Sequence, residues 1–173
     1  MGGCHDGHNQ QFFIPSGGFI GSTQGILEWS ELRVRSNPGA CVDSGPVTHL
    51  WLHPCTGSRN QKFKFEYLPE LPPSAPPPSP HHPITTLPDS YHAATLLRVK
   101  FQPNGVIGAQ SSQMNRLQSQ PALDIGFGAL YQMFWIQPNG QSDSNGNNFF
   151  HIRYRDNQHW CASARNAHTH IVM

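Results

Sequence analysis

Hydrophobic and polar residues alternate in several short stretches of the chain, and turn-forming residues separate these stretches. Residues 62–67 read Lys-Phe-Lys-Phe-Glu-Tyr, in which polar and aromatic side chains alternate as in a strand with one buried face. Shorter strands are predicted at 31–35, 40–43 and 49–53. Ser-Asn-Pro-Gly at 36–39 predicts a turn, because proline fixes φ and glycine tolerates a positive φ. The pattern predicts an all-β fold, with no amphipathic helix of useful length in this part of the chain.

Two motifs occur twice, which indicates that the chain is built from repeated units. Residues 4–12 and 55–63 both read Cys-x4-Asn-Gln-x-Phe. Residues 32–41 and 152–161 both read Leu/Ile-Arg-x-Arg-x-Asn-x3-Cys. The pieces are the tail of one unit, one nearly complete unit and the head of a third, at about 1–15, 30–67 and 149–173.

The repeat pattern is not found between the second and third pieces. Residues 72–80 are rich in proline and favour the extended polyproline II conformation of a linker. Apolar patches follow within 95–137. We expect residues 68–148 to be a disordered Pro-rich linker or insertion between partial units at 1–67 and 149–173. Non-coding sequence read through in the gene is an alternative of equal weight.

Composition and charge narrow the classes of function. The chain has eleven Lys and Arg residues and ten Asp and Glu residues. Its net charge of +1 gives no electrostatic reason to bind nucleic acid or an anionic membrane. No apolar run reaches the roughly 18 residues that cross a bilayer. We therefore expect no nucleic-acid partner and no membrane contact by this segment. The first residues lack the pattern of a signal peptide, so a secretory targeting segment is expected upstream.

The order Cys41-Val42-Asp43, then Pro54-Cys55, then Asn60-Gln61-x-Phe63 resembles one lobe of a ricin B-type β-trefoil. It is most similar to the C-terminal lectin domain of the polypeptide N-acetylgalactosaminyltransferases. The resemblance implies a partial β-trefoil, with one near-complete lobe, pieces of two others and a long irregular insertion. It covers less than half of the chain, at residues 1–15, 28–67 and 149–163.

The resemblance also implies a carbohydrate site in the central lobe. Asp43 would accept hydrogen bonds from two adjacent sugar hydroxyls, and Asn60 would bond to one of them. The ring of His53 would stack on the sugar, with Trp51 as a second candidate for that role. Each residue has a structural alternative: Asp43 caps the turn at 44–46, Asn60 braces its loop, and the two rings pack under a neighbouring lobe.

The resemblance implies different states for Cys41 and Cys55 than for the other two cysteines. It implies a disulfide between Cys41 and Cys55, which would contribute roughly 3 kcal/mol by the chain-entropy model. The family pattern leaves Cys4 and Cys161 as free thiols, although they could also bond to each other. Ser163 stands where the family has an aspartate, so we do not expect a sugar site in the third lobe.

We therefore expect binding of GalNAc or galactose on glycans or glycopeptides, by a fragment of a Golgi peptide O-GalNAc transferase in the lumen of the secretory pathway. The alternative is a non-binding structural or truncated product of such a transferase. No catalytic motif and no metal-ligand spacing occur in the sequence, so no catalytic residue, metal site or cofactor is assigned. Manganese would belong only to a catalytic domain outside this chain, and enzyme activity and oligomeric state are left open.

Overall fold

The computed structural model describes residues 3–15, 26–45, 49–67, 95–109, 117–121, 132–154, 159–164 and 171–172. These residues form β-strands and two short 3-10 helices, which confirms the predicted all-β class. No helix in the described ranges has the length and apolar character needed to cross a membrane.

The elements are short and follow one another in chain order as η1 (His8–Gln10), β1 (Phe12–Phe13), β2 (Ile26–Glu31), β3 (Arg33–Val34), β4 (Asn37–Asp43), β5 (Trp51–Pro54), η2 (Arg59–Gln61), β6 (Lys62–Tyr67), β7 (Thr95–Val99), β8 (Gln102–Ala109), β9 (Leu117–Pro121), β10 (Met133–Ser142), β11 (Asn148–Tyr154), β12 (Ser163–Ala164) and β13 (Ile171–Val172).

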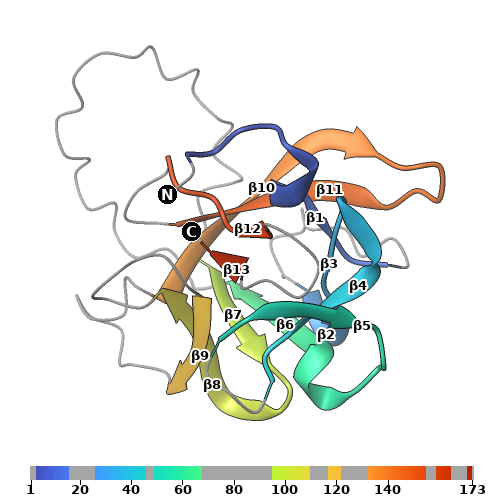
Figure 1. The fold of residues 1–173 in the computed structure, drawn as a ribbon. Coiled ribbons are helices and arrows are strands. Elements are labelled where there is room, and N and C mark those ends of the chain that lie inside the picture. The colour runs from blue at the N-terminus through green and yellow to red at the C-terminus, as the bar shows by residue number, and fades with distance from the viewer. Residues whose placement is uncertain are drawn as a thin grey trace, which may run out of the picture.

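The paired strands of the main antiparallel sheet can be followed in a row from β2 to β3 (Figure 1). Strand β6 pairs with β2 and β7, β10 pairs with β7 and β11, and β1 pairs with β11 and β3. Only Leu32 separates β2 from β3. Because these two strands are consecutive, the row of paired strands returns to its start and forms a ring.

The register of this ring repeats three times. Phe12, Phe63 and Phe134 occupy equivalent positions, and all are fully buried. Each lies opposite one residue on each of its two neighbouring strands. These partners are Val34 and Phe150 for Phe12, Val99 and Ser30 for Phe63, and Tyr154 and Thr95 for Phe134.

Three hairpins, β4–β5, β8–β9 and β12–β13, complete the three repeats. The backbone N–H of Leu50 donates to the carbonyl of Leu117 (2.9 Å), and the N–H of Ile171 donates to the carbonyl of Leu50 (2.7 Å). All three side chains are buried in the core. The hairpins therefore meet at one place and bury apolar side chains together.

The described residues thus form three similar units. Unit A comprises β2 to β6 (26–67), unit B comprises β7 to β10 (95–142), and unit C comprises β11 to β13 (148–172) together with η1 and β1 (3–13). Unit C is assembled from both ends of the chain, and a disulfide between Cys4 and Cys161 joins its two halves. The expectation of two free thiols at these cysteines is therefore wrong, and the alternative that they bond to each other is right.

Unit B lies inside the segment 68–148 that we expected to be a disordered linker or insertion. Residues 95–99 of β7 pair with β6, and β10 pairs with both β7 and β11. The apolar patches of this segment are the buried faces of these strands, with Leu97 and Ile136 in the core. The proline-rich residues 72–80 lie outside the described residues.

Replacing Phe134 by alanine tests whether unit B belongs to the same cooperative core. We expect Phe134→Ala to lower the free energy of unfolding by about 3–5 kcal/mol, because it empties a fully buried site. The matched variant Phe63→Ala, at the equivalent position of unit A, should cost a similar amount. Urea unfolding followed by tryptophan fluorescence measures both, and a near-zero effect of Phe134→Ala alone would contradict the three-unit ring.

Candidate functional site

Asp43 is a buried carboxylate at the end of β4. Its side chain is only 4% exposed, so its charge needs donors from the protein. Oδ1 accepts hydrogen bonds from the backbone N–H of Gly45 (2.7 Å) and from Nδ2 of Asn60 (2.5 Å). Oδ2 accepts one from Nε2 of Gln61 (2.9 Å). The bond to Gly45 is the predicted turn cap, and the bond to Asn60 joins the two polar residues of the predicted site.

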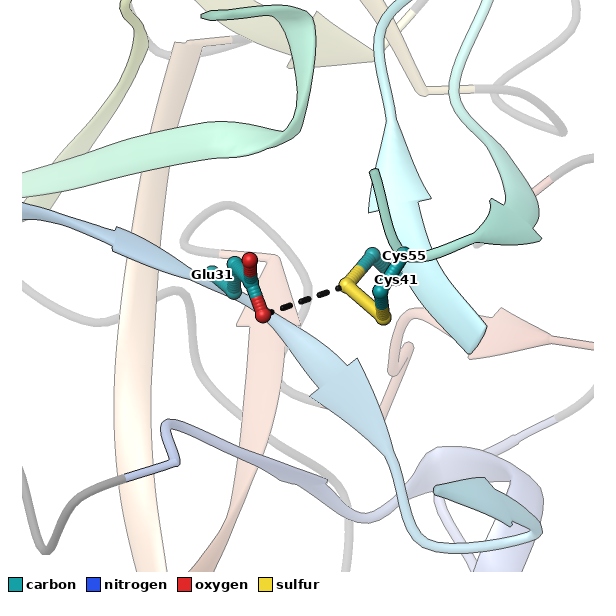
Figure 2. Close-up of side chains that lie close together, drawn as sticks. All are labelled: Glu31, Cys41 and Cys55. Atoms are coloured by element: carbon teal, nitrogen blue, oxygen red, sulfur yellow. Dashed lines mark hydrogen bonds between the residues drawn. A yellow bond between two sulfur atoms is a disulfide. The ribbon is translucent and has the colours of Figure 1, made fainter. Parts of the chain in front are cut away.

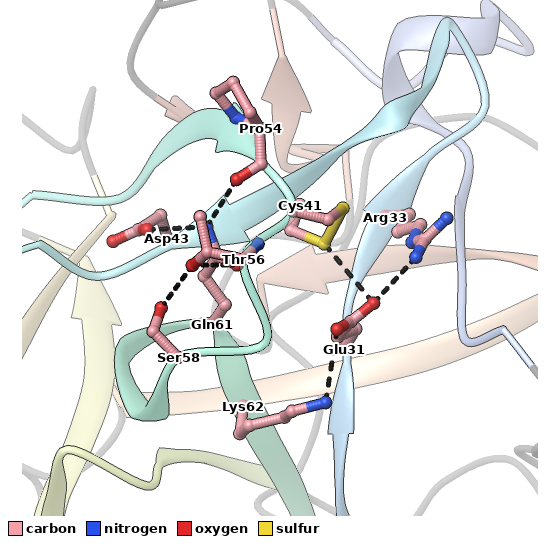
Figure 3. A network of polar contacts seen from close by, with 10 residues as sticks. Glu31, Arg33, Cys41, Asp43, Pro54, Thr56, Ser58, Gln61 and Lys62 are labelled. Atoms are coloured by element: carbon pink, nitrogen blue, oxygen red, sulfur yellow. Dashed lines mark hydrogen bonds and ion pairs between the residues drawn. A yellow bond between two sulfur atoms is a disulfide. The ribbon is translucent and has the colours of Figure 1, made fainter.

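Gln61 holds the loop around this carboxylate in place (Figure 3). The side chain is fully buried, and Nε2 also donates to the carbonyl of Pro54 (2.9 Å). Its Oε1 accepts from the backbone N–H of Thr56 (2.7 Å) and from the hydroxyl of Thr56 (3.1 Å). Gln61 thus connects the end of β5, the following loop and Asp43.

The two predicted ring platforms lie on β5, which pairs with β4. Trp51 is directly opposite Asp43, and His53 is opposite Cys41. Because alternate residues of a strand share a face, both rings lie on the same face of the hairpin as Asp43. Trp51 is half-buried, and His53 is exposed. The structure therefore brings Asp43, Asn60 and Trp51 together, with His53 further along the strand.

Gly45 determines where the indole of Trp51 lies. Its backbone has a φ of +50°, a conformation that side-chain-bearing residues rarely adopt. A Cβ at this position would lie 3.0 Å from Cζ2 of Trp51. The absence of a side chain thus lets the indole pack against the turn that Asp43 caps.

The predicted disulfide between Cys41 and Cys55 is present, next to the carboxylate of Glu31 (Figure 2). Oε2 of Glu31 accepts from Arg33 (2.7 Å) and lies 3.5 Å from Sγ of Cys41, while Oε1 accepts from Lys62 (3.2 Å). The hydrogen bond from Arg33 lowers the pKa of Glu31 most strongly, burial opposes it, and Lys62 lowers the pKa further.

Glu31, Cys41 and Cys55 are also the group of metal-ligand side chains found within the described part of the chain, with ligand atoms within 4.8 Å of one another. Both sulfur atoms belong to the disulfide, so neither is a thiolate that could bind zinc. The carboxylate already pairs with two cations. This cluster has the chemistry of a structural ion pair.

Unit C repeats the geometry of the Asp43 site with different chemistry. Nδ2 of Asn9 donates to the hydroxyl of Ser163 (2.8 Å), as Asn60 donates to Asp43. Oε1 of Gln10 accepts from the N–H of His5 (2.7 Å), and Nε2 donates to the carbonyl of Gly3 (3.1 Å). Ser163 therefore takes the place of Asp43, and the equivalent position of unit C has no carboxylate.

Unit B, which sequence reasoning missed, has lost the residues by which the repeat is recognised. In unit B, Arg98 lies opposite Val106, as Arg33 lies opposite Cys41 in unit A. Val106 therefore occupies the position of Cys41, and Gly108, two residues later, occupies the position of Asp43. Two weaker signals were available. Leu-Arg-Val at 97–99 repeats 32–34, and Gln-x-Phe at 132–134 repeats 61–63.

No family model matches this chain, and no curated protein matches it either. The family resemblance stays an interpretation of the motifs.

The different chemistry of units A and C predicts different costs of mutation. Asp43→Ala leaves three donors without their acceptor, and we expect it to lower the free energy of unfolding by about 3 kcal/mol. Ser163→Ala removes one neutral hydrogen bond at the equivalent position and should cost about 1 kcal/mol. Chemical denaturation of both variants measures the difference, and equal costs would show that Asp43 does not organise its loop.

Proposed function

We propose that this chain binds carbohydrate, of the GalNAc or galactose class, at Asp43 of unit A. The observation that carries the proposal is a buried carboxylate that is hydrogen-bonded to Asn60 and lies directly opposite the indole of Trp51. A carboxylate, an amide and an aromatic ring are the groups that match the hydroxyls and the apolar face of a sugar.

The hydrogen bonds around Asp43 leave capacity for a ligand. A carboxylate oxygen accepts about two hydrogen bonds. Oδ1 already accepts two, whereas Oδ2 accepts one, from Gln61. Among the described residues, none donates to the side-chain oxygen of Asn60. A sugar hydroxyl can therefore donate to Oδ2 of Asp43 and a second can donate to Asn60, while the C–H face lies on Trp51 or, further out, on His53.

The architecture supports a β-trefoil as the setting of this site. Six paired segments close a ring, and three hairpins meet at Leu50, Leu117 and Ile171. A β-trefoil has this arrangement of three four-stranded units, and the ricin B-type resemblance assigns the same fold. The proposed trefoil has all three units, with unit C completed by the N-terminal residues.

Unit A carries the one carboxylate at the equivalent positions of the three units, since Ser163 and Gly108 replace Asp43 in the others. One sugar is therefore proposed per chain. The two disulfides fit an oxidising compartment such as the secretory pathway. The proposed origin in a Golgi peptide O-GalNAc transferase rests on the motifs alone. Glycans or glycopeptides are the proposed partners. The competing proposal is a non-binding structural product of the same ancestry.

A titration of the amide NMR spectrum with GalNAc tests the proposal. We expect shifts confined to unit A, with a dissociation constant on the order of 1 mM, or about −4 kcal/mol. Asp43→Asn, which keeps the side-chain size and removes the charge, should abolish the shifts. Ser163→Ala is the matched control in unit C and should bind as the unchanged chain does.

Glucose, the C4 epimer of galactose, is the control ligand for the sugar class. Well-dispersed spectra that do not respond to GalNAc or galactose would favour the non-binding product. Equal shifts with glucose would retain sugar binding but reject the GalNAc and galactose class. Shifts that persist in a folded Asp43→Asn variant would place the ligand elsewhere.

A further inference from the structure

The ion pair beside the disulfide of unit A has a different counterpart in unit C. Ala162 donates to the carbonyl of Ile152 (2.9 Å) as Val42 donates to that of Leu32 (2.8 Å), so Ile152 is equivalent to Leu32. The residues on either side of Ile152 are His151 and Arg153, where unit A has Glu31 and Arg33.

The neighbouring strand and the disulfide follow the same equivalence. Arg153 lies opposite Cys161 as Arg33 lies opposite Cys41. Phe12 pairs with Phe150, which places Gln11 beside His151, as Lys62 lies beside Glu31. Unit C thus has a histidine where unit A has the carboxylate that neutralises two cations.

His151 is buried, with a side chain that is 4% exposed. Within the described ranges of the chain, its Nε2 atom has no hydrogen-bond partner. Its cross-strand neighbour is Gln137, whose buried Oε1 likewise has no partner among these residues. The charged and titratable groups that face His151 are Arg153 on the same strand and Asp6 and His5 in the segment before η1.

A neutral imidazole fits this environment better than an imidazolium. Burial lowers the pKa of His151 most, and the nearby Arg153 and His5 lower it further, while Asp6 partly opposes them. Protonation would place a second buried cation beside a guanidinium, at the position where unit A supplies an anion.

We propose that His151 makes unit C an acid-sensitive part of the fold: its protonation opens the packing of the N-terminal segment on β11 and β12, while unit A stays closed. Unit C is suited to such opening because it is built from both chain ends, which meet at the Gly3–Trp160 bridge and at the bond from the N–H of Cys4 to the carbonyl of His159 (2.7 Å).

The pH range follows from the lowered pKa values of His151 and Glu31. An exposed histidine titrates near pH 6.5, so the opened unit takes up a proton more readily than the closed one. The contribution of neutral His151 is complete above pH 6.5 and is lost as pH falls through its lowered pKa. Glu31 has a pKa below the ordinary glutamate value, so its contribution is lost only at more acidic pH. The range from about pH 6.5 to 5 therefore separates His151 from Glu31.

The relative rate at which the two disulfides are reduced tests the proposal in the intact chain. A water-soluble phosphine attacks one sulfur, water supplies the oxygen of the phosphine oxide, and both sulfurs leave as thiols. Each bridge joins one fully buried and one half-buried cysteine, which makes their rates comparable. Alkylation of the released thiols and peptide mass spectrometry give the reduction rate of each bridge. The ratio of the Cys4–Cys161 rate to the Cys41–Cys55 rate is independent of the reagent's own pH dependence, because both bridges meet the same reagent.

We expect this ratio to rise severalfold between pH 7.5 and pH 5. In His151→Gln, which is neutral throughout, the ratio should be independent of pH. His151→Glu restores the carboxylate of unit A and should give the same flat profile. His8→Gln replaces an exposed histidine of the same unit and should behave as the unchanged chain.

Two results would overturn the proposal: a ratio that does not change with pH in the unchanged chain, or the same rise in His151→Gln. If His151→Glu fails to fold, His151→Gln alone decides, because it keeps a neutral polar side chain of similar reach. Neither outcome depends on sugar binding.

Discussion

The fold depends on the pairing of β1 with strands from two different units. Phe12 of β1 lies between Val34 of β3 and Phe150 of β11. Without β1, the facing sides of β3 and β11 would expose unpaired backbone groups at the edge of the sheet. Since β1 comes from the start of the chain and β11 from near its end, the ring closes only when the two ends meet. The Cys4–Cys161 disulfide and the hydrogen bond between Asn9 and Ser163 stabilise this meeting.

One backbone arrangement is used three times with different polar chemistry. Unit A places carboxylates at Asp43 and Glu31, each surrounded by donors. Unit C keeps the amides that surround Asp43 but replaces both carboxylates, by Ser163 and His151. The three units keep a fully buried phenylalanine at the equivalent positions Phe12, Phe63 and Phe134, so packing there tolerates these exchanges. The candidate site and the acid-sensitive position therefore reflect differences between units that fold alike.

Local patterns in the sequence predicted the all-β class and the repeat, whereas the Cys41–Cys55 bridge and the grouping of Asp43 with Asn60 were implied by the family resemblance. Unit B was missed because Val106 and Gly108 stand where unit A has Cys41 and Asp43, which removed the polar residues of the motif. The apolar register survives in Phe134, yet a single aromatic residue is weak evidence in a sequence. The Cys4–Cys161 bridge joins residues 157 positions apart, and only the closed ring brings them together.

The Cys4–Cys161 bridge also makes most of the chain part of one covalent ring. It closes almost the whole chain into one loop, which in the chain-entropy model restricts the unfolded state by on the order of 5 kcal/mol. A single backbone cut anywhere between Cys4 and Cys161 leaves both fragments attached to each other through the sulfur atoms. Nicked molecules would therefore keep the mass of one chain, apart from one added water, until a reductant separates the pieces.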